Sequence, residues 1–464
     1  MLLLGRIVAA LISGALLAQA YSLNPFWPLA WIAPIPMLIA AIGASRLGAF
    51  AYGAIAGVMS IVLMISYLSD IGGIVTVLII AVSKALIWGA MAYAVRGASH
   101  LLPKWAAVFV FPALMTGIDT LTAAFSPHST AGALAYSQMD FIPAIQVASL
   151  GGAPAITFIV TLFASAIALL IAKRAIVGFL APALMVTAAL AFGYARIAQP
   201  LPAGETIDVT LIAGDQFEGV PDDWRAVWNA YTPQIERAAD DGRHVIVLPE
   251  KIAHLEPGDR AAAIEQLGEI ARRRDLLIVA GADDETEEGG RFNRAFVFER
   301  TEWHTYDKRH MIPGLESEFQ LGTADLKFEN GGVLYGVAIC KDMDFPDLAR
   351  GYAGVDVMIV PAWDFDVDAW FHSRMAVLRG VENGYSIIRS ARNGVLTVSD
   401  GYGRVTSQAP SGPQTAYNVT APATGLGATL YSRTGDVFGW TMLALAGVLI
   451  GWTIWARRRA GQGD

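Results

Sequence analysis

The stretch Gly331-Gly-Val-Leu-Tyr-Gly-Val-Ala-Ile-Cys340 is an apolar run that ends on the only cysteine of the 464-residue chain. Polar residues follow at once, Lys341 and Asp342, and Phe345-Pro346 can then open a helix. The pattern predicts a buried strand over Val333–Cys340 with a thiol at its tip, just before a helix. Backbone N–H groups and the helix dipole can stabilise a thiolate at such a place. Taken alone, however, a single cysteine is more often a small buried hydrophobic residue.

Two earlier apolar segments also end on a charged residue. The segment His244-Val-Ile-Val-Leu-Pro-Glu250 delivers a carboxylate, and the segment Trp303-His-Thr-Tyr-Asp-Lys308 delivers an amine. Either residue taken singly is more often a solvated charge, and Lys308 has charged neighbours that favour a surface ion pair. A scheme in which Cys340 works with a histidine, His310 or His372, is an alternative template for the same thiol.

The composition divides the chain into two parts. Hydrophobic residues make up 54% of it and charged residues only 16%, against about 25% charged residues in soluble globular proteins, which indicates a membrane protein or a membrane domain. Three of the 41 acidic residues, Asp70, Asp119 and Asp140, occur before residue 200. The net charge of −8 therefore belongs to the later part. It argues against a nucleic-acid partner.

Roughly seven apolar stretches before residue 200 approach the length of about 20 residues that spans a bilayer. They are Leu2–Tyr21, Pro28–Gly43, Ala49–Leu68, Ile74–Val95, Trp105–Phe125, Ile145–Ala172 and Ile176–Ala195, and an eighth, Val437–Ala456, lies near the end. Basic residues fall in alternate loops and after the last stretch, namely Arg46, Arg96, Lys104, Lys173, Arg174 and Arg457-Arg458-Arg459. The positive-inside rule thus predicts cytoplasmic termini, with residues of about 200–435 outside. Alternatively, the first stretch is a signal peptide that ends at Ala18-Gln-Ala20, with the same topology afterwards.

After residue 204 the pattern changes to short β-rich runs between amphipathic helical segments, which predicts helices outside sheets. Strands are expected at Ile207–Ala213, Val245–Leu248, Leu276–Ala280, Ala295–Glu299, Val333–Cys340, Val357–Val360, Ser386–Arg389 and Val395–Ser399. Helices are expected at Asp222–Asp240, Gly258–Arg274, Pro346–Gly351 and Trp370–Asn383. Asp400-Gly401 predicts a hairpin turn.

Glutamate, lysine and cysteine at three strand ends, in this chain order, resemble the carbon–nitrogen hydrolase (nitrilase) superfamily. Four further segments resemble one family within it, the bacterial apolipoprotein N-acyltransferases: Asn24–Trp31, Gly132–Gln138, Ala148–Gly152 and Thr429–Asp436. The resemblance implies a multi-pass α-helical membrane domain plus an α/β nitrilase-type α-β-β-α sandwich domain. The implied boundaries are 1–200 for about seven transmembrane helices, 205–425 for the catalytic domain and 436–457 for a C-terminal transmembrane helix.

The resemblance also assigns roles to individual residues. It implies that Glu250 is the general base, Lys308 the catalytic lysine and Cys340 the nucleophile. Two more acidic residues, Glu316 and Asp342, match supporting positions.

Two tryptophans, Trp224 and Trp363, match substrate-binding positions of the family. This chain departs from the family at two places. It reads Cys340-Lys341-Asp342 where Cys-Tyr-Glu is usual, and Lys251 stands where a small or polar residue is commoner. The departures put the choice of acyl donor or acceptor in question more than the chemistry.

The implied activity is transfer of a fatty acyl chain from a phospholipid, through a Cys340 thioester, to a lipoprotein. The acceptor would be the α-amine of the N-terminal diacylglyceryl-cysteine of a diacylated apolipoprotein. We expect a monomer in the bacterial cell inner membrane, with the catalytic domain on the periplasmic side, and no metal or other cofactor. Two alternatives stay open. One is a membrane-tethered carbon–nitrogen amidase or hydrolase that resolves the thioester with water, and the other is a catalytically inactive scaffold that binds lipid or lipoprotein.

Overall fold

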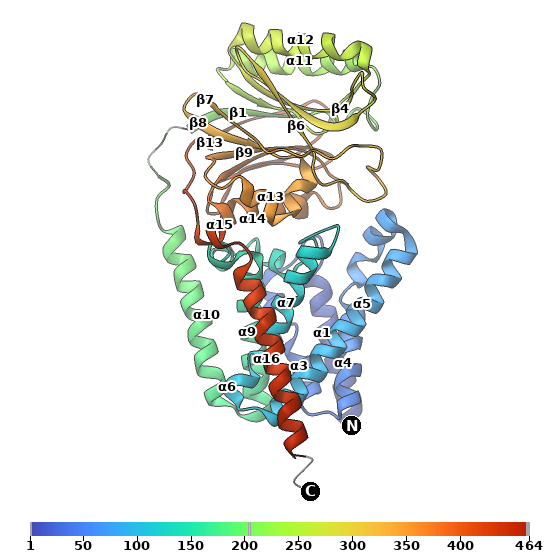
Figure 1. Cartoon of the computed structure of the whole chain (residues 1–464), viewed down its shortest axis with the longest axis vertical. Coiled ribbons are helices and arrows are strands. Elements are labelled where there is room, and N and C mark those ends of the chain that lie inside the picture. Colours follow the sequence, from blue (N-terminus) through green and yellow to red (C-terminus); the bar gives the residue numbers. More distant parts are fainter. Residues whose placement is uncertain (1, 203, 205, 461–464) are drawn as a thin grey trace. The chain divides into compact units, whose positions relative to one another are not determined.

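The computed structural model describes residues 2–202, 204 and 206–460 of the chain (Figure 1). These residues form two compact units. The helical unit comprises residues 2–126, 130–198 and 434–460. The sandwich unit comprises residues 127–129 and the described residues of 199–433.

The helical unit consists of apolar helices joined by short connections. Its elements are α1 (Leu2–Ala20), α2 (Trp27–Ile32), α3 (Ile35–Ile42), α4 (Arg46–Met59), η1 (Val62–Met64), α5 (Ile65–Leu101), α6 (Lys104–Ala107), α7 (Val110–Phe125), η2 (Leu134–Gln138), α8 (Ile142–Ile145), α9 (Ala148–Lys173), α10 (Ile176–Ile197) and α16 (Val437–Ala460). Within the described residues, six stretches are long and apolar enough to cross a membrane: Leu3–Ala20, Arg46–Leu101, Lys104–Phe125, Ala148–Lys173, Ile176–Ile197 and Val437–Ala460.

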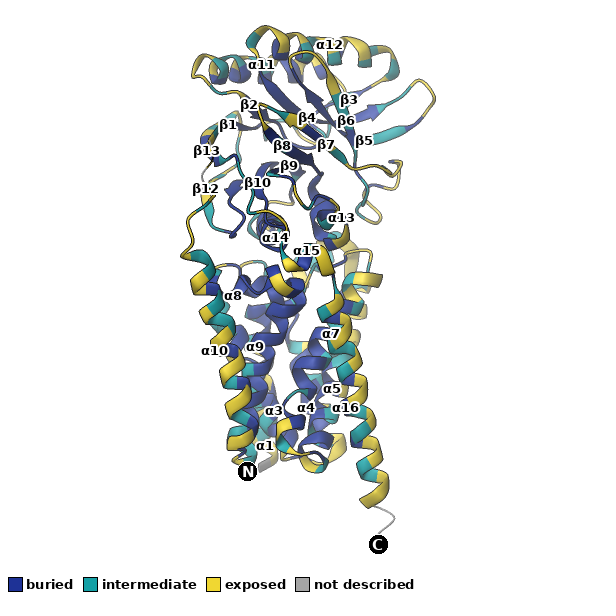
Figure 2. Cartoon of the chain, turned by 60° about the vertical axis from the view of Figure 1, so that its left-hand side comes forward, coloured by how far each residue is buried: buried dark blue, intermediate teal, exposed yellow. Residues whose placement is uncertain are grey.

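The surface of this unit has the character that a lipid environment requires. Figure 2 shows exposed positions along α10, while α9 is almost entirely buried. Large apolar side chains such as Ile176, Leu180 and Leu184 are exposed on α10. A row of exposed apolar side chains is costly in water and favourable in a bilayer. The multi-pass helical character that the composition predicts is therefore confirmed.

Prolines and a glycine change the boundaries of two predicted spans. The span expected over Pro28–Gly43 is two short helices, α2 and α3, because Pro34 has no backbone N–H to continue a helix. The loop expected near residues 69–73 instead lies inside α5, where only Gly73 (φ 69°, ψ 176°) leaves helical geometry. The connection between these two spans occurs earlier, at η1.

The sandwich unit contains two β-sheets. One, sheet A, has the strand order β13-β1-β2-β4-β5-β6, with β3 also paired to β4, and the other, sheet B, has the order β12-β11-β10-β9-β8-β7. The strands are β1 (Thr206–Ala213), β2 (Val245–Val247), β3 (His254–Leu255), β4 (Leu277–Glu285), β5 (Arg291–Phe298), β6 (Trp303–Asp307), β7 (Leu326–Asn330), β8 (Val333–Val337), β9 (Val357–Trp363), β10 (Ser386–Arg392), β11 (Val395–Ser399), β12 (Val405–Pro410) and β13 (Thr415–Pro422). The helices are α11 (Trp224–Asp240), α12 (Pro257–Arg274), η3 (Cys340–Asp344), α13 (Pro346–Gly351) and α14 (Ala369–Asn383), and α15 (Leu430–Thr434) follows at the boundary with the helical unit.

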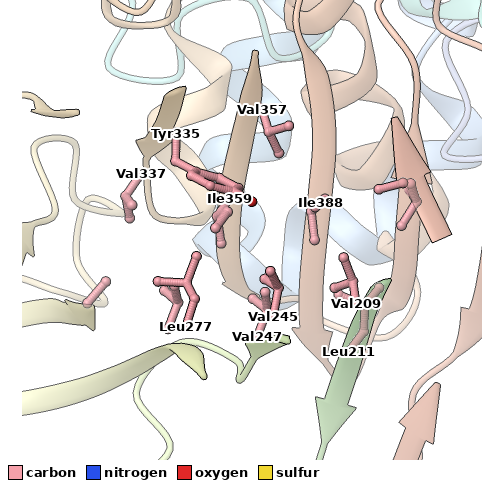
Figure 3. Packing of buried hydrophobic residues seen from close by; sticks show 14 of the residues in the cluster. Val209, Leu211, Val245, Val247, Leu277, Tyr335, Val337, Val357, Ile359 and Ile388 are labelled. Atoms are coloured by element: carbon pink, nitrogen blue, oxygen red, sulfur yellow. The ribbon is translucent and has the colours of Figure 1, made fainter. Parts of the chain in front are cut away.

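Three hydrophobic cores separate four layers. The central core lies between the sheets, where Val209 and Val247 of sheet A meet Val337 and Ile359 of sheet B (Figure 3). A second core packs α11 and α12 on the outer face of sheet A, and a third packs α13 and α14 on the outer face of sheet B. The helices of these two outer layers lie on opposite sides of the sheets in Figure 1. The α-β-β-α sandwich predicted for this region is therefore confirmed.

The sequence reading missed β7 and placed the end of β8 too late. Gly331 (φ 58°) and Gly332 (φ 78°) form the two-residue turn that joins these strands, with both residues in the left-handed region. This is the geometry of a type I′ hairpin, for which Gly-Gly is a favoured sequence. The predicted strand Val333–Cys340 ends at Val337. The chain turns there because the backbone N–H of Ile339 bonds to the Asp342 carboxylate, and Cys340 then begins η3.

Candidate active site

Four charged side chains form a buried cluster on sheet A, which we call the lysine cluster: Glu250, Lys251, Lys308 and Glu316. The Lys308 ammonium lies 2.8 Å from Glu250 Oε1 and 2.8 Å from Glu316 Oε2. Lys251 Nζ lies 2.6 Å from Glu316 Oε1. The amide of Asn293 on β5 donates to Glu250 (2.6 Å) and to Glu316 (3.0 Å). Two cations and two carboxylates thus neutralise one another away from solvent.

The electrostatics of this cluster fix its charges over a wide pH range. Burial lowers the pKa of Lys308, but the Glu250 and Glu316 carboxylates outweigh burial and hold the pKa well above its usual value. Burial raises the pKa of Glu316, yet the charges of Lys308 and Lys251 bring it down to about 2. Lys308 is therefore an ammonium and Glu316 a carboxylate at neutral pH.

Tight backbone turns at strand ends position the two central residues of the cluster. Glu250 follows β2, and its N–H donates to the carbonyl of Ala362 on β9 (3.3 Å). A Cβ at Gly281 on β4 would lie 2.6 Å from the Glu250 Cα, so a larger residue there would displace Glu250. Lys308 follows β6, and its N–H donates to the Asn293 carbonyl (2.8 Å). The strand ends predicted to carry these side chains do carry them.

Cys340 lies in the turn after β8, where its backbone adopts a left-handed conformation (φ 43°) that is uncommon for a residue with a side chain. Its thiol is 7% exposed and donates to the carbonyl of Trp363 (3.7 Å). Because β8 and β9 are parallel neighbours, their carboxyl ends meet at one edge of sheet B. Burial and the Glu250 carboxylate raise the pKa of the thiol above its ordinary value. The helix expected after the cysteine, α13, starts only at Pro346, and Cys340 itself begins the short turn η3.

Asp342 holds the Cys340 turn to the loop that follows Lys308. Its carboxylate accepts from Tyr306 Oη (2.7 Å) and from the backbone N–H groups of Arg309 (3.1 Å) and His310 (2.9 Å). It also accepts from the N–H of Ile339 (3.2 Å), one residue before the cysteine. The residue thus connects two of the three predicted catalytic positions, as a supporting residue would.

The two predicted substrate-binding tryptophans have different surroundings. The Trp363 ring has two cation–π contacts, with its centroid 5.5 Å from Lys251 Nζ and 4.0 Å from Arg392 Cζ, and its carbonyl accepts from Cys340. Trp224 is buried in the core between α11 and sheet A, where its ring packs edge-on against Trp228 at 6.1 Å. The structure brings Trp363 to the other site residues and does not bring Trp224 to them.

Two of the residues at which the sequence departs from the predicted pattern, Lys251 and Lys341, place ammonium groups at the site. Lys251 adopts a left-handed backbone conformation (φ 46°) and belongs to the lysine cluster. Lys341 is 6% exposed, and its Nζ lies 3.5 Å from Asp344 and 3.3 Å from His128, which belongs to the sandwich unit. Both charges therefore have neighbours within the unit.

A second charged cluster lies on sheet B, and the sequence reading gave it little weight. We call it the histidine cluster: Asp364, Asp368, His372 and Arg389. His372 Nδ1 lies 3.6 Å from Asp364, and His372 Nε2 lies 3.5 Å from Asp368. Asp364 accepts two bonds from the Arg389 guanidinium (2.5 and 2.9 Å). A His372 ring nitrogen, an Asp364 oxygen and Cys340 Sγ all lie within 4.8 Å of one another.

The composition of this second cluster also bears on metal binding, because Cys, His and Asp are the usual ligands of Zn²⁺. Both oxygens of Asp364 are already bonded to Arg389, whose charge would repel a cation at the same carboxylate. A tetrahedral site built on Cys340, Asp364 and His372 would have to break this ion pair. The donor set therefore fits an ion-pair cluster better than a metal site.

A simple signal could have found part of this second cluster. Asp364 directly follows the buried strand β9, just as Lys308 directly follows β6 and Glu250 comes three residues after β2. His372 gives no comparable signal, because its approach to Cys340 depends on how α14 packs beside η3. Asn293 gives none either, since it lies within the strand β5.

Two family models match the chain, one for each unit. Residues 13–166 match the apolipoprotein N-acyltransferase N-terminal domain, and residues 212–420 match carbon-nitrogen hydrolases. The apolipoprotein N-acyltransferase of Geobacter metallireducens is 26% identical over 95% of this chain and 94% of its own length. That of Gloeobacter violaceus is 25% identical over 95% of this chain and 92% of its own length. A solved CN-hydrolase superfamily protein from Xanthomonas campestris covers 52% of this chain and 97% of its own, with 18% identity and a TM-score of 0.42.

Proposed function

Because the chain resembles the apolipoprotein N-acyltransferases over almost its whole length, we propose that it is an acyltransferase that N-acylates lipoproteins. The observation that carries the proposal is the meeting of the predicted base and nucleophile at the end of β9. Glu250 bonds to the backbone of Ala362, Cys340 bonds to that of Trp363, and Lys308 binds Glu250. A carboxylate, an ammonium and a thiol in one buried place are the groups that acyl transfer through a covalent intermediate needs.

In the first half-reaction, Cys340 attacks the ester carbonyl of a phospholipid. Glu250 takes the thiol proton as the S–C bond forms, because the thiol is protonated at rest. The Lys308 ammonium stabilises the negative charge that develops on the carbonyl oxygen. When the C–O bond breaks, Glu250 returns the proton to the departing oxygen, and a lyso-lipid leaves. The acyl chain remains on Cys340 as a thioester.

In the second half-reaction, the α-amine of a diacylglyceryl-cysteine attacks the thioester. Glu250 takes a proton from the amine as the N–C bond forms. The C–S bond then breaks, and Glu250 returns the proton to the Cys340 sulfur. The two half-reactions share one base and one oxyanion partner, which gives a ping-pong scheme. The acceptor is an amide after the reaction, so the product is a triacylated lipoprotein.

The location follows from the pattern of basic residues together with the helical unit. We propose that the protein lies in the bacterial inner membrane as a monomer, with residues 1–200 and 436–457 as the membrane part. The catalytic domain, residues 205–425, would face the periplasm. A reporter that functions only in the cytoplasm, fused after Gly412 between β12 and β13, should then be silent. A bright signal from this fusion would overturn the orientation and with it the lipoprotein role.

The main alternative is a hydrolase that releases the acyl chain to water, and the acceptor separates the two. Most α-amines are protonated near neutral pH, since their ordinary pKa is about 7.7–8.0. A transferase must therefore deprotonate the amine locally and exclude water. Glu250 can serve as that base, and apolar residues of the loop after β9, such as Trp363 and Phe365, can keep water from the thioester.

The experiment uses the purified protein in detergent with a phospholipid. Lyso-lipid should form slowly at first, and a diacylated lipopeptide with a free N-terminal amine should raise its release strongly. The same peptide with an acetylated amine is the control and should have no effect. Rapid release of lyso-lipid and free fatty acid without any amine would favour the hydrolase instead. Absence of both products together with lipopeptide binding would favour the inactive scaffold.

A further inference from the structure

We propose that His372 is a second cation at the nucleophile, held by Asp364 and Asp368, and that it stabilises the Cys340 thiolate whenever the sulfur carries negative charge. The inference deepens the proposed function, because it rests on Cys340 as the acyl carrier. It assigns a role to a residue outside the glutamate–lysine–cysteine trio. The role is electrostatic, and it differs from proton abstraction by a neutral histidine.

The geometry brings the imidazole within 4.8 Å of the Cys340 sulfur and within 4 Å of two carboxylates. His372 lies on α14, and Asp368 precedes the first residue of this helix, four residues before His372. Asp364 comes from the end of β9, next to the carbonyl that accepts from the thiol. The two ring nitrogens thus face different carboxylates, at 3.6 and 3.5 Å. A ring with an acidic partner on each side can keep both of its protons.

The carboxylates themselves are rigidly held. Asp364 is 2% exposed and is bonded through both oxygens to Arg389. Asp368 is fully buried, and its Oδ1 accepts from the N–H of Phe365 (3.0 Å). Burial lowers the pKa of His372, but Asp364, Cys340 and Asp368 together raise it well above its ordinary value. The side chain is therefore an imidazolium at neutral pH.

An imidazolium has no lone pair with which to accept the thiol proton. The inference therefore assigns the proton transfer to Glu250 and an electrostatic role to His372. The charged groups that act on Cys340 are Glu250 and Asp364, which disfavour the thiolate, and Lys308 and His372, which favour it. The Arg389 charge also reaches the sulfur. Lys308 lies 2.8 Å from each of its two carboxylates, whereas His372 lies 3.5–3.6 Å from its own two, so the charge of His372 is less closely neutralised by its partners.

The sulfur of Cys340 carries negative charge, and can be stabilised by His372, twice in each catalytic cycle. The sulfur becomes negative when Glu250 removes its proton, and again when the thioester C–S bond breaks. In both cases a positive charge within about 4–6 Å lowers the free energy of the thiolate. Such a charge typically lowers the pKa of the group beside it by about one to three units. No bond to His372 forms or breaks, and its proton stays on the ring throughout.

The test measures alkylation of Cys340 by iodoacetamide as a function of pH, in the full-length protein in detergent. Because Cys340 is the only cysteine, the mass adduct reports this thiol alone. His372→Gln should alkylate about tenfold more slowly than the wild type at pH 7.5, with its pH midpoint about one unit higher. His304→Gln is the matched control, because His304 pairs with Glu299 in a different part of the unit. It should keep the wild-type profile.

Two more variants separate charge from structure. His372→Arg keeps a positive charge and should restore most of the alkylation rate, whereas a purely structural histidine would not be rescued by a longer side chain. Asp368→Asn removes one supporting carboxylate and should shift the midpoint in the same direction as His372→Gln, by less. If His372→Gln does not fold, Asp368→Asn carries the test by itself.

A wild-type alkylation profile in folded His372→Gln or in folded Asp368→Asn would overturn the inference. This readout does not depend on any lipid or lipoprotein. A shifted profile in a protein that transfers no acyl chain would therefore leave the inference standing and reject the proposed function. A wild-type alkylation profile in a folded His372→Gln variant, together with acyl transfer by the wild-type enzyme, would reject the inference and leave the proposed function standing.

Discussion

The lysine cluster and the histidine cluster both act on Cys340 and are built alike, yet they differ in how firmly their charge is fixed. Each contains two carboxylates and two cations. In the lysine cluster the shortest distances from ammonium to carboxylate are 2.6–2.8 Å, and the Lys308 side chain is fully buried. In the histidine cluster the imidazole lies 3.5–3.6 Å from its carboxylates, and its side chain is 21% exposed.

The difference shows how one site can combine a fixed charge with an adjustable one. Lysine and glutamate in the lysine cluster have pKa values displaced far from neutrality in opposite directions, so no ordinary pH change alters them. Histidine is the residue type whose unperturbed pKa lies near neutrality, so the charge of the second cluster depends on its two aspartates. The first cluster should therefore determine whether the site works at all, and the second should tune it.

The largest effect should come from substitution of Cys340, the residue on which charges of both clusters act. Cys340→Ser should fold normally but lose acyl transfer by at least about a thousandfold, because a neutral hydroxyl is a far poorer nucleophile than a thiolate. Intact mass of the wild type incubated with phospholipid should show an acyl adduct, and the variant should show none. Activity of the variant close to that of the wild type would reject Cys340 as the acyl carrier.

The next largest effect should be loss of the central cation of the lysine cluster. Lys308→Met leaves Glu250 and Glu316 buried without their common partner, which for a buried ion pair typically costs about 3–5 kcal/mol. For a domain of this size, that corresponds to a fall in melting temperature of about 10 °C. Acyl transfer should also be lost. Lys327→Met is the control, because the exposed Lys327 donates to the backbone carbonyl of Gly351 and lies over the Tyr352 ring, and no ion pair is described for it. A melting curve for Lys308→Met that matches that control would show that the cluster is not held by this cation.

How much of this arrangement the sequence could predict depends on the distance along the chain that each contact spans. Glu250, Lys308 and Cys340 were predictable, because each follows an apolar run and strand ends gather at one edge of a sheet. The four layers were predictable by resemblance to the carbon–nitrogen hydrolases. The exact end of β8 was not, because the Asp342 carboxylate bonds to the Ile339 N–H and turns the chain three residues early.

The histidine cluster shows where sequence reasoning fails in principle. His372 approaches Cys340 only because α14 packs beside η3, and no local pattern encodes a helix-to-turn contact over 32 residues of sequence. Trp224 shows a different limit, since a matching residue type does not by itself fix the environment, and its substrate-binding role stays a prediction. Its ring is enclosed between α11 and sheet A, where packing accounts for an aromatic residue without any substrate.

Low pH should weaken the lysine cluster through protonation of Glu316. Its pKa is depressed to about 2 from an ordinary 4.5, so it stabilises the folded state above about pH 4.5, and that contribution is lost as the pH falls toward 2. Glu316→Gln should be less stable at pH 7, by up to about 3 kcal/mol. It should also show a flatter dependence of melting temperature on pH between about 5 and 2. Glu318→Gln, at an exposed position two residues later, should keep the wild-type dependence. An unchanged acid dependence in Glu316→Gln would mean that other groups carry it.

The smallest effect should come from Trp363, which contacts one cluster and adjoins the other in sequence. Its ring has cation–π contacts with Lys251 of the lysine cluster and with Arg392, and the residue directly precedes Asp364 of the histidine cluster. Trp363→Leu removes the aromatic face but keeps an apolar side chain. Loss of a cation–π contact is worth about 0.5–1 kcal/mol, or about two- to fivefold in a rate ratio. Free fatty acid should therefore rise two- to fivefold relative to N-acylated peptide, because water reaches the thioester more easily.

Trp224→Leu is the matched control for this change, and it should have the reverse signature. Its ring is buried in the core of α11 and sheet A, so the variant should lose stability through imperfect packing and keep the ratio of fatty acid to acylated peptide. The ratio is the decisive measurement, because it does not depend on how much folded enzyme each preparation contains. A raised ratio in Trp224→Leu, with a normal one in Trp363→Leu, would reverse the assignment of the two tryptophans and place the acceptor beside α11.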